Sequence, residues 1–279
     1  MKIKKKILLL PHGATTTLRF ISNHSATTTI LVLPALGVPA SYYDVLLISL
    51  FDCNFSVACV DFHGQGESSI KANSKIDFGY KELLEIDIPV AIEATKKILS
   101  KQLFLFGHSL GGQMACLYAG QHQHNIKGII LCLSGSVFYK SWNGLSRYKV
   151  LIGTQFSILL SRFLGYFPGH IIGFGGKTGK QLIIDWGTQS RSGLYTIGKS
   201  NIDWENGLEN IKLPILGISL DNDFMAPKGA MTHLCNKMKN ARFNHIILKM
   251  PSFNHFRWAR SPEPIIREVI KWENNLKEK

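Results

Sequence analysis

A serine enclosed by glycines is the residue of this sequence best suited to nucleophilic chemistry. The run Gly107-His108-Ser109-Leu110-Gly111 follows the apolar stretch Leu103–Phe106 and precedes a helix-forming stretch from Gln113 to Gln121. A strand, a sharp turn and a helix in this order form a nucleophile elbow, in which a strained backbone lifts the serine hydroxyl above the sheet. Glycines flank the serine because side chains there would collide with the neighbouring strand or helix. The pattern predicts Ser109 as a nucleophile.

A serine hydroxyl needs a base that accepts its proton, and the base needs a carboxylate that orients it. On a doubly wound sheet these partners come from the ends of later strands, in the order serine, acid, histidine. His255 lies in the loop after the last apolar strand and is the expected base, whereas His245 lies inside that strand. Asp223, in the turn after the strand Ile215–Leu220, is the expected acid. Asp221 is the alternative, and both aspartates are also common turn formers.

Acyl transfer also develops an oxyanion, which needs preorganised hydrogen-bond donors. The backbone N–H of Leu110, at the start of the helix, is one expected donor. The second is expected from the loop after the apolar strand Thr29–Leu33, where Leu36 is best placed. Backbone donors have no side-chain signature, so both assignments rest on topology alone.

Apolar runs alternate with helical patterns along most of the chain, which predicts an α/β fold with a parallel, doubly wound sheet. An antiparallel start is expected from strands Lys2–Leu10 and Thr15–Ile21 around a Pro-His-Gly turn. The other expected elements are strands 29–33, 56–60, 103–106, 128–133, 214–220 and 242–248, and helices 41–51, 89–99, 113–121, 227–238 and 263–275.

The alternation breaks between residues 135 and 206, a glycine- and aromatic-rich stretch that is too long for a plain connection. We interpret it as an inserted, mostly helical cap over the strand ends, and residues 1–134 and 207–279 as the core domain. The apolar side chains of the cap favour a substrate with an apolar acyl or alkyl group. Ordinary core packing nevertheless accounts for the larger part of such residues.

The composition indicates a globular chain with a basic but ordinary surface. Its 279 residues, 45% hydrophobic and 18% charged, suit one large α/β domain. Apart from an N-terminal cluster, the net charge of +13 is spread along the chain without a nucleic-acid-binding motif, so no nucleic-acid partner is expected; the cluster consists of Lys2, Lys4, Lys5 and Lys6. The five cysteines are scattered and form no Cys-x-x-Cys pair, which favours a reducing compartment.

Two apolar segments imitate targeting or membrane signals, but both are too short. Ile7–Leu10 ends at Pro11, below the ~7–15 residues of a signal-peptide core. Val150–Leu164 contains polar residues and falls short of the ~20 residues of a membrane span. We therefore expect a cytoplasmic protein. No cofactor or metal is expected, because neither a metal-ligand spacing nor a dinucleotide glycine pattern occurs.

With these residues in hand, the chain resembles the α/β-hydrolase superfamily over essentially its whole length. The resemblance rests on the joint order of four motifs: Gly107-His108-Ser109-Leu110-Gly111-Gly112, Asp61-Phe62-His63-Gly64-Gln65-Gly66-Glu67-Ser68, Asp223 with Pro227, and Asn254-His255-Phe256. It implies a Ser109–His255–Asp223 triad and an oxyanion hole.

A narrower resemblance points to bacterial hydrolases near the serine aminopeptidase-like and monoacylglycerol-lipase-like branch. The loop 34–39 followed by Tyr42-Tyr43, and the cap stretch 163–169, are similar to that subgroup. One departure is Pro34-Ala35, where most relatives in the superfamily carry His-Gly in the oxyanion loop. Backbone donors survive this change.

Three functions are compatible with these residues. The first is a serine hydrolase that cleaves a small-molecule carboxylic ester or thioester through an acyl-enzyme. Association with an anionic membrane surface, through the basic N-terminus and the apolar cap, is compatible with this function. The second is an aminopeptidase-like amide hydrolase, for which Asp185, Asp203 and Glu205 are the acids that could receive a substrate amine. The third is a non-catalytic protein of this fold that binds a ligand or partner.

Overall fold

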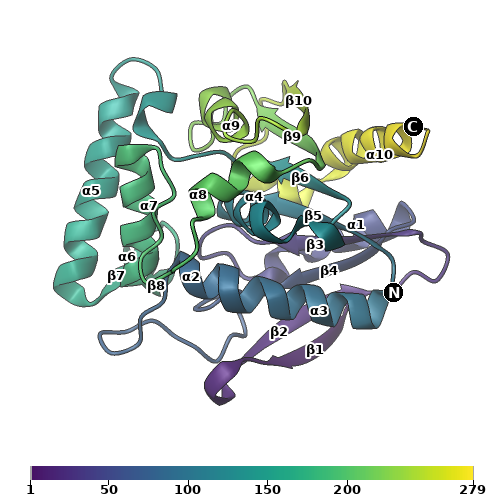
Figure 1. The fold of residues 1–279 in the computed structure, drawn as a ribbon, viewed down its shortest axis with the longest axis horizontal. Coiled ribbons are helices and arrows are strands. Elements are labelled where there is room, and N and C mark those ends of the chain that lie inside the picture. Colours follow the sequence, from purple (N-terminus) through teal and green to yellow (C-terminus); the bar gives the residue numbers. More distant parts are fainter. Residues whose placement is uncertain (1, 279) are drawn as a thin grey trace.

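The computed structural model describes residues 2–278, and eight of their strands form one sheet in the order β1-β2-β4-β3-β5-β6-β9-β10 (Figure 1). β2 is antiparallel to both β1 and β4, and every other neighbouring pair is parallel. The predicted mostly parallel, doubly wound sheet with an antiparallel start is confirmed. The strands are β1 Lys4–Leu9, β2 Thr15–Ile21, β3 Thr28–Leu33, β4 Ser56–Val60, β5 Gln102–His108, β6 Gly128–Cys132, β9 Pro214–Leu220 and β10 Arg242–Leu248.

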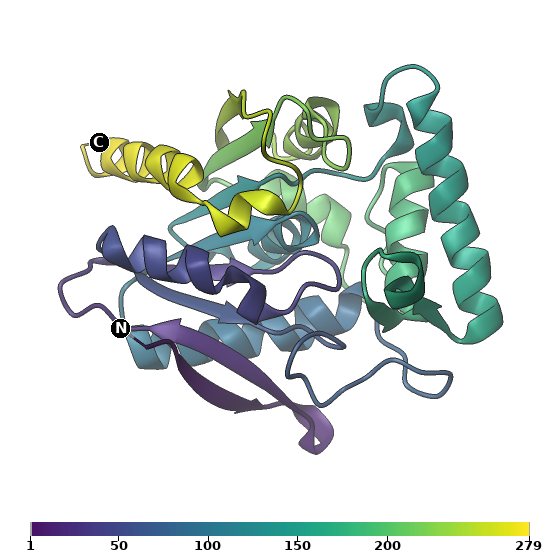
Figure 2. The same ribbon diagram turned by 180° about the vertical axis from the view of Figure 1, so that it is seen from behind.

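Helices cover both faces of the sheet because the central strands are apolar on both sides (Figures 1 and 2). Along β3, Leu31 and Leu33 pack with residues of α3 and α4, whereas Ile30 and Val32 pack with residues of α1 and α10. The core helices are α1 Asp44–Asp52, α2 Tyr80–Glu82, α3 Ile88–Leu99, α4 Leu110–His122, α8 Trp204–Gly207, α9 Lys228–Cys235 and α10 Glu263–Lys277.

The helix predicted to begin at Pro89 starts earlier. α2 continues through a π-helical segment, Leu83–Asp87, into α3. The wider π turn accommodates Pro89, whose ring would clash with the carbonyl four residues earlier in a regular α-helix. Proline is therefore tolerated here inside a helical segment, although the sequence pattern favoured it as the helix start.

The segment predicted as a cap extends beyond the strand ends (Figures 1 and 2). Polar contacts join its two long helices: Gln155 Nε2 donates to the Gly187 carbonyl oxygen at 2.8 Å, and Thr154 Oγ1 lies 3.1 Å from Ser190 Oγ. The segment also contains a short antiparallel β7–β8 pair that was not predicted, since three-residue strands show no readable alternation. Its elements are α5 Ser146–Leu164, β7 Tyr166–Pro168, α6 Gly169–Ile172, β8 Lys177–Gly179 and α7 Lys180–Ser192.

The division into a core of residues 1–134 and 207–279 and a cap of residues 135–206 stays a prediction. The short helix α8 crosses the expected boundary at residue 206. Met1 and Lys279, the outer limits of the expected core, lie outside the described residues.

Glycines allow β3, β5 and α4 to approach closely at the serine turn. A Cβ on Gly111 would lie 2.0 Å from the Leu33 carbonyl oxygen, and one on Gly107 would lie 2.3 Å from Gly112 Cα. Both neighbours are backbone atoms, which cannot rotate away. A side chain at either position would therefore force the backbone of the turn to shift.

We expect Gly111→Ala to lower the free energy of unfolding by about 2 kcal/mol, because the methyl group overpacks a contact between backbone segments. Gly153→Ala is the matched control: Gly153 lies in helix α5, and a Cβ there would meet no heavy atom within 4 Å. Alanine should leave stability unchanged or raise it by up to about 1 kcal/mol. Urea unfolding measures both variants, and equal midpoints would contradict the packing argument.

Candidate active site

The carboxyl ends of β5, β9 and β10 bring three of the predicted site residues together. Ser109 directly follows β5, Asp223 lies in the turn after β9, and His255 lies in the loop after β10. Parallel strands present their carboxyl ends at one edge of the sheet, where ligands of open α/β sheets bind. Residues distant in sequence thus meet at one place.

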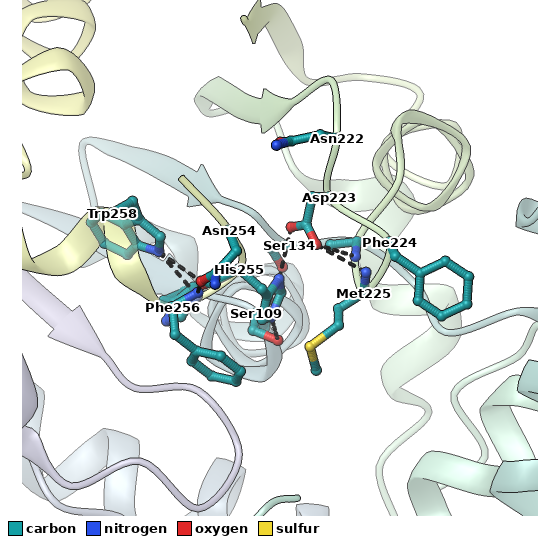
Figure 3. Close-up of polar contacts among 12 residues, drawn as sticks. Ser109, Ser134, Asn222, Asp223, Phe224, Met225, Asn254, His255, Phe256 and Trp258 are labelled. Atoms are coloured by element: carbon teal, nitrogen blue, oxygen red, sulfur yellow. Dashed lines mark hydrogen bonds and ion pairs between the residues drawn. The ribbon is translucent and has the colours of Figure 1, made fainter. Parts of the chain in front are cut away.

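The His255 ring lies between Ser109 and Asp223 (Figure 3). His255 Nε2 is 2.9 Å from Ser109 Oγ, and Nδ1 is 2.7 Å from Asp223 Oδ2. An ionised carboxylate only accepts hydrogen bonds, so the neutral imidazole carries its proton on Nδ1 and Nε2 accepts from the Ser109 hydroxyl. The second oxygen of Asp223 accepts from the backbone N–H of Met225 at 2.9 Å and of Ala226 at 3.2 Å. The carboxylate is therefore held on both oxygens.

The alternative residues lie elsewhere. Asp221 is exposed at the end of β9, and its backbone N–H donates to the Leu248 carbonyl oxygen. His245 Nε2 lies 2.9 Å from Ser219 Oγ, within the sheet. Within residues 2–278, Asp221 makes no hydrogen bond to His255, and His245 makes none to Ser109.

The Ser109 backbone is held in an unusual conformation, with φ 52° and ψ −118°. L-residues other than glycine rarely adopt positive φ, and such strain persists only where the surroundings enforce it. Its N–H donates to the Cys132 carbonyl at 3.2 Å, and its own carbonyl accepts from Ser134 Oγ at 2.6 Å and from the Gly112 N–H at 3.0 Å. These contacts with β6 and α4 fix the serine at the start of the helix.

The two predicted oxyanion donors, Leu36 and Leu110, both line a pocket beside Ser109. Within residues 2–278, neither backbone N–H donates to a protein acceptor, and the Leu110 N–H belongs to the open first turn of α4. Neighbouring groups hold the Leu36 loop: the Ala35 carbonyl accepts from Gln65 Nε2 at 3.1 Å, and the Ala40 N–H donates to Asp61 Oδ1 at 2.7 Å. The turn from Asp61 to Ser68 therefore supports this loop.

A buried hydrogen-bond relay lies behind the site, and sequence reasoning did not identify it. His108 Nε2 lies 2.8 Å from the His255 carbonyl oxygen, which only accepts, so Nε2 carries the proton. His108 Nδ1 then accepts from the Tyr43 hydroxyl at 2.7 Å, and that hydroxyl oxygen accepts from the Ala35 N–H at 3.0 Å. Trp258 Nε1 also donates to the His255 carbonyl, at 3.1 Å. The relay joins the loop of Leu36 to the loop of His255.

The relay is uncharged. Burial lowers the pKa of His108 well below its ordinary value, and the neighbouring His255 adds to this shift. Burial likewise raises the pKa of Tyr43 well above the usual range. A neutral histidine and a neutral phenol can donate and accept in one fixed direction, which suits a structural connection.

An apolar pocket of about 420 Å³ opens over Ser109, between the strand ends and the cap. Large side chains from the cap and from the turn after β9 form much of its wall, including Trp142, Phe156, Trp186 and Phe224. Among the described residues that line it, Lys149 is the only charged one. The cavity therefore favours an apolar group beside the serine hydroxyl.

None of the three acids considered for amine recognition lines this pocket. Asp185 is buried and accepts from the backbone N–H of Tyr80 at 2.9 Å and of Gly198 at 3.0 Å. Asp203 caps helix α8 by accepting from the Asn206 N–H, and Glu205 forms an ion pair with Lys237. Hydrogen bonds and an ion pair within the protein therefore account for the positions of these acids.

The sheet order, the flanking helices and the elbow at Ser109 define the fold of an α/β hydrolase. The sequence profile of the family described as "Serine aminopeptidase, S33" matches residues 24–166. The chain belongs to this family of α/β hydrolases and is a hydrolase. No curated protein matches the sequence.

Solved structures of hydrolases share the fold. An esterase from Exiguobacterium antarcticum is 16% identical, with a TM-score of 0.65 over 96% of this chain and 99% of that chain. A Pyrococcus furiosus esterase is 15% identical, with a TM-score of 0.62 over 98% and 91%. The thioesterase domain of the curacin biosynthetic pathway is 15% identical, with a TM-score of 0.63 over 97% and 100%. At these identities the similarity establishes the fold alone.

The buried neutral His108 should make the fold sensitive to acid. The unfolded chain binds a proton at His108 below the ordinary pKa of 6.5, whereas the folded protein binds it only at a much lower pH. The contribution of His108 is therefore complete above about pH 6.5 and is lost as the pH falls below that value. We expect His108→Gln to reduce the pH slope of the unfolding free energy by about 1.4 kcal/mol per unit between about pH 6 and 5.

Urea unfolding at a series of pH values measures this slope. His124→Gln, which removes an exposed histidine, is the matched control and should keep the wild-type slope. The slope, rather than the absolute stability, is compared, because His108→Gln also disturbs hydrogen bonds of the relay. Identical slopes for wild type and His108→Gln would show that His108 takes up its proton without unfolding.

Proposed function

We propose that this hydrolase cleaves a carboxylic ester or thioester that carries an apolar acyl or alkyl group. One observation carries the proposal: His255 joins Ser109 Oγ, at 2.9 Å, to the Asp223 carboxylate, at 2.7 Å, beside an apolar pocket. A hydroxyl, a base and an orienting acid in this order are the arrangement that activates a serine nucleophile.

The proposed reaction follows from this geometry. Ser109 Oγ attacks the substrate carbonyl carbon while its proton moves to His255 Nε2, and Asp223 stabilises the imidazolium that forms. The N–H groups of Leu36 and Leu110 hold the developing oxyanion. His255 then protonates the departing alcohol or thiol, which leaves Ser109 acylated. Water attacks the acyl-enzyme with His255 as the base, releasing the acid and restoring the serine.

The lining of the pocket supports an ester or thioester over a peptide-like amide. An aminopeptidase must receive a charged amine, and among the described lining residues the one charged side chain, Lys149, is a cation that would repel it. The esterases and the thioesterase domain of the same fold are consistent with this choice. A purely binding role is less well supported, because Ser109, His255 and Asp223 are all present and hydrogen-bonded.

Labelling with a fluorophosphonate probe tests whether Ser109 is activated. We expect an adduct on Ser109, found by peptide mass spectrometry, that is lost in Ser109→Ala and strongly reduced in His255→Ala, because the base is then missing. His245→Ala is the matched control and should label normally. If the folded wild-type protein forms no adduct, the binding role becomes the better explanation.

A pair of aspartate variants tests the acid. We expect Asp223→Asn to lower kcat on a short-chain nitrophenyl ester by about 10⁴-fold, because the amide favours the wrong tautomer of His255. Asp221→Asn should leave kcat unchanged, since that side chain does not reach His255. The reverse pattern would assign the role to Asp221. Faster turnover of aminoacyl-naphthylamides than of nitrophenyl esters would instead favour the amide substrate.

A further inference from the structure

The outer side of α5 carries a row of exposed apolar side chains. They recur every three or four residues and therefore share one side of the helix. Helix α5 itself lies at the outer edge of the cap (Figures 1 and 2). The opposite side packs on α7 through Thr154, Ile158 and their neighbours. We call the row the α5 stripe; with their exposed fractions, its members are Leu145 77%, Tyr148 53%, Ile152 68%, Phe156 63%, Leu159 63% and Phe163 88%.

Basic residues accompany the stripe, and acidic residues are missing from the whole segment around it. Residues 135–184 contain no aspartate or glutamate. They contain six lysines and arginines, of which Lys149 and Arg162 are exposed on α5, one on each side of the stripe. Within the described residues neither of these two forms an ion pair. This face therefore combines apolar and positively charged groups.

The stripe continues to the mouth of the pocket. Phe156 belongs to the stripe and also lines the pocket. Ile172 of α6 and Phe224 after β9 are lining residues as well, and they are 56% and 58% exposed. Lys149 adds a positive charge at the same place. The exposed apolar face and the entrance to Ser109 are thus one continuous surface.

We propose that this face, formed by the α5 stripe with Ile172 and Phe224, docks on an anionic lipid bilayer. Apolar side chains on one side of a helix insert at the boundary between headgroups and acyl chains, while lysine and arginine contact the lipid phosphates. A second copy of the chain fits less well, because two acid-free basic faces would repel each other.

The proposed contact is a surface contact. Within residues 2–278, no helix is long and apolar enough to cross a membrane. The contact does not depend on the reactivity of Ser109. One further step rests on the proposed function: in the docked orientation, the pocket admits an acyl chain from the lipid.

Co-sedimentation of the full chain carrying Ser109→Ala tests docking without catalysis. We expect binding to mixed vesicles of phosphatidylcholine and phosphatidylglycerol, and much weaker binding to phosphatidylcholine alone. In the same background, Ile152→Glu with Phe163→Glu should weaken partitioning about tenfold or more, because both side chains would enter the headgroup region. Lys149→Gln and Arg162→Gln should each weaken it about fivefold, and less at high salt.

The N-terminus offers a matched control. Ile7 and Leu9 of β1 are 70% and 76% exposed, beside the cluster of Lys2, Lys4, Lys5 and Lys6. Ile7→Glu with Leu9→Glu makes the same charge change on a different surface and should leave partitioning unaltered. Circular dichroism melting confirms that each variant is folded.

Three results would overturn the proposal. The first is that the folded protein does not sediment with anionic vesicles. The second is that the N-terminal variant loses binding as strongly as the α5 variant, which would assign binding to the lysine cluster. The third is a wild-type dimer in light scattering that becomes a monomer with Ile152→Glu and Phe163→Glu, which would assign the stripe to self-association. None of these readouts uses ester hydrolysis, so a failed esterase assay leaves the docking test intact.

Discussion

The close contact between β3, β5 and the first turn of α4 is the constraint on which the rest of the site depends. Gly111 lies directly against the Leu33 carbonyl, and Ser109, two residues earlier, has a positive φ at the start of the helix. In that conformation the hydroxyl meets His255, and the Leu110 N–H opens toward the same pocket. One strained residue therefore brings the Ser109 hydroxyl and the Leu110 N–H close together, and the surrounding sheet maintains the strained conformation.

Loops alone would hold such a site poorly, because they are the most mobile parts of a fold. Here a buried relay through Tyr43 and His108 connects the Ala35–Leu36 loop with the His255 loop, directly behind Ser109. Each hydrogen bond in the relay has a fixed donor and acceptor, because the His255 carbonyl at one end can only accept and the Ala35 N–H at the other end can only donate. A fully satisfied buried network rigidifies its surroundings. The Ala35–Leu36 loop and the His255 loop are thereby held by the same set of contacts.

Helix α5 of the cap differs from an ordinary surface helix in which of its sides is apolar. An ordinary surface helix buries its apolar side and exposes a polar one. In α5 the packed side is partly built from small and polar residues such as Thr154 and Ser161, whereas large apolar residues face outward. The outward residues lead into the pocket above Ser109, so the surface of the cap and the lining of the site form a single apolar feature. The proposed apolar substrate and the proposed lipid contact both rest on this arrangement.

The sequence by itself determined the sheet and its strand alternation, and it singled out Ser109, His255 and Asp223 as candidates, because this chemistry needs specific side chains in a specific order. Local spacing also shows which residues of a helix share a side. Only the tertiary structure decided that Asp223 rather than Asp221 meets His255, that Tyr43 contacts a histidine 65 residues away, and which side of α5 is buried. These outcomes depend on contacts between distant segments, and local sequence patterns do not encode such contacts.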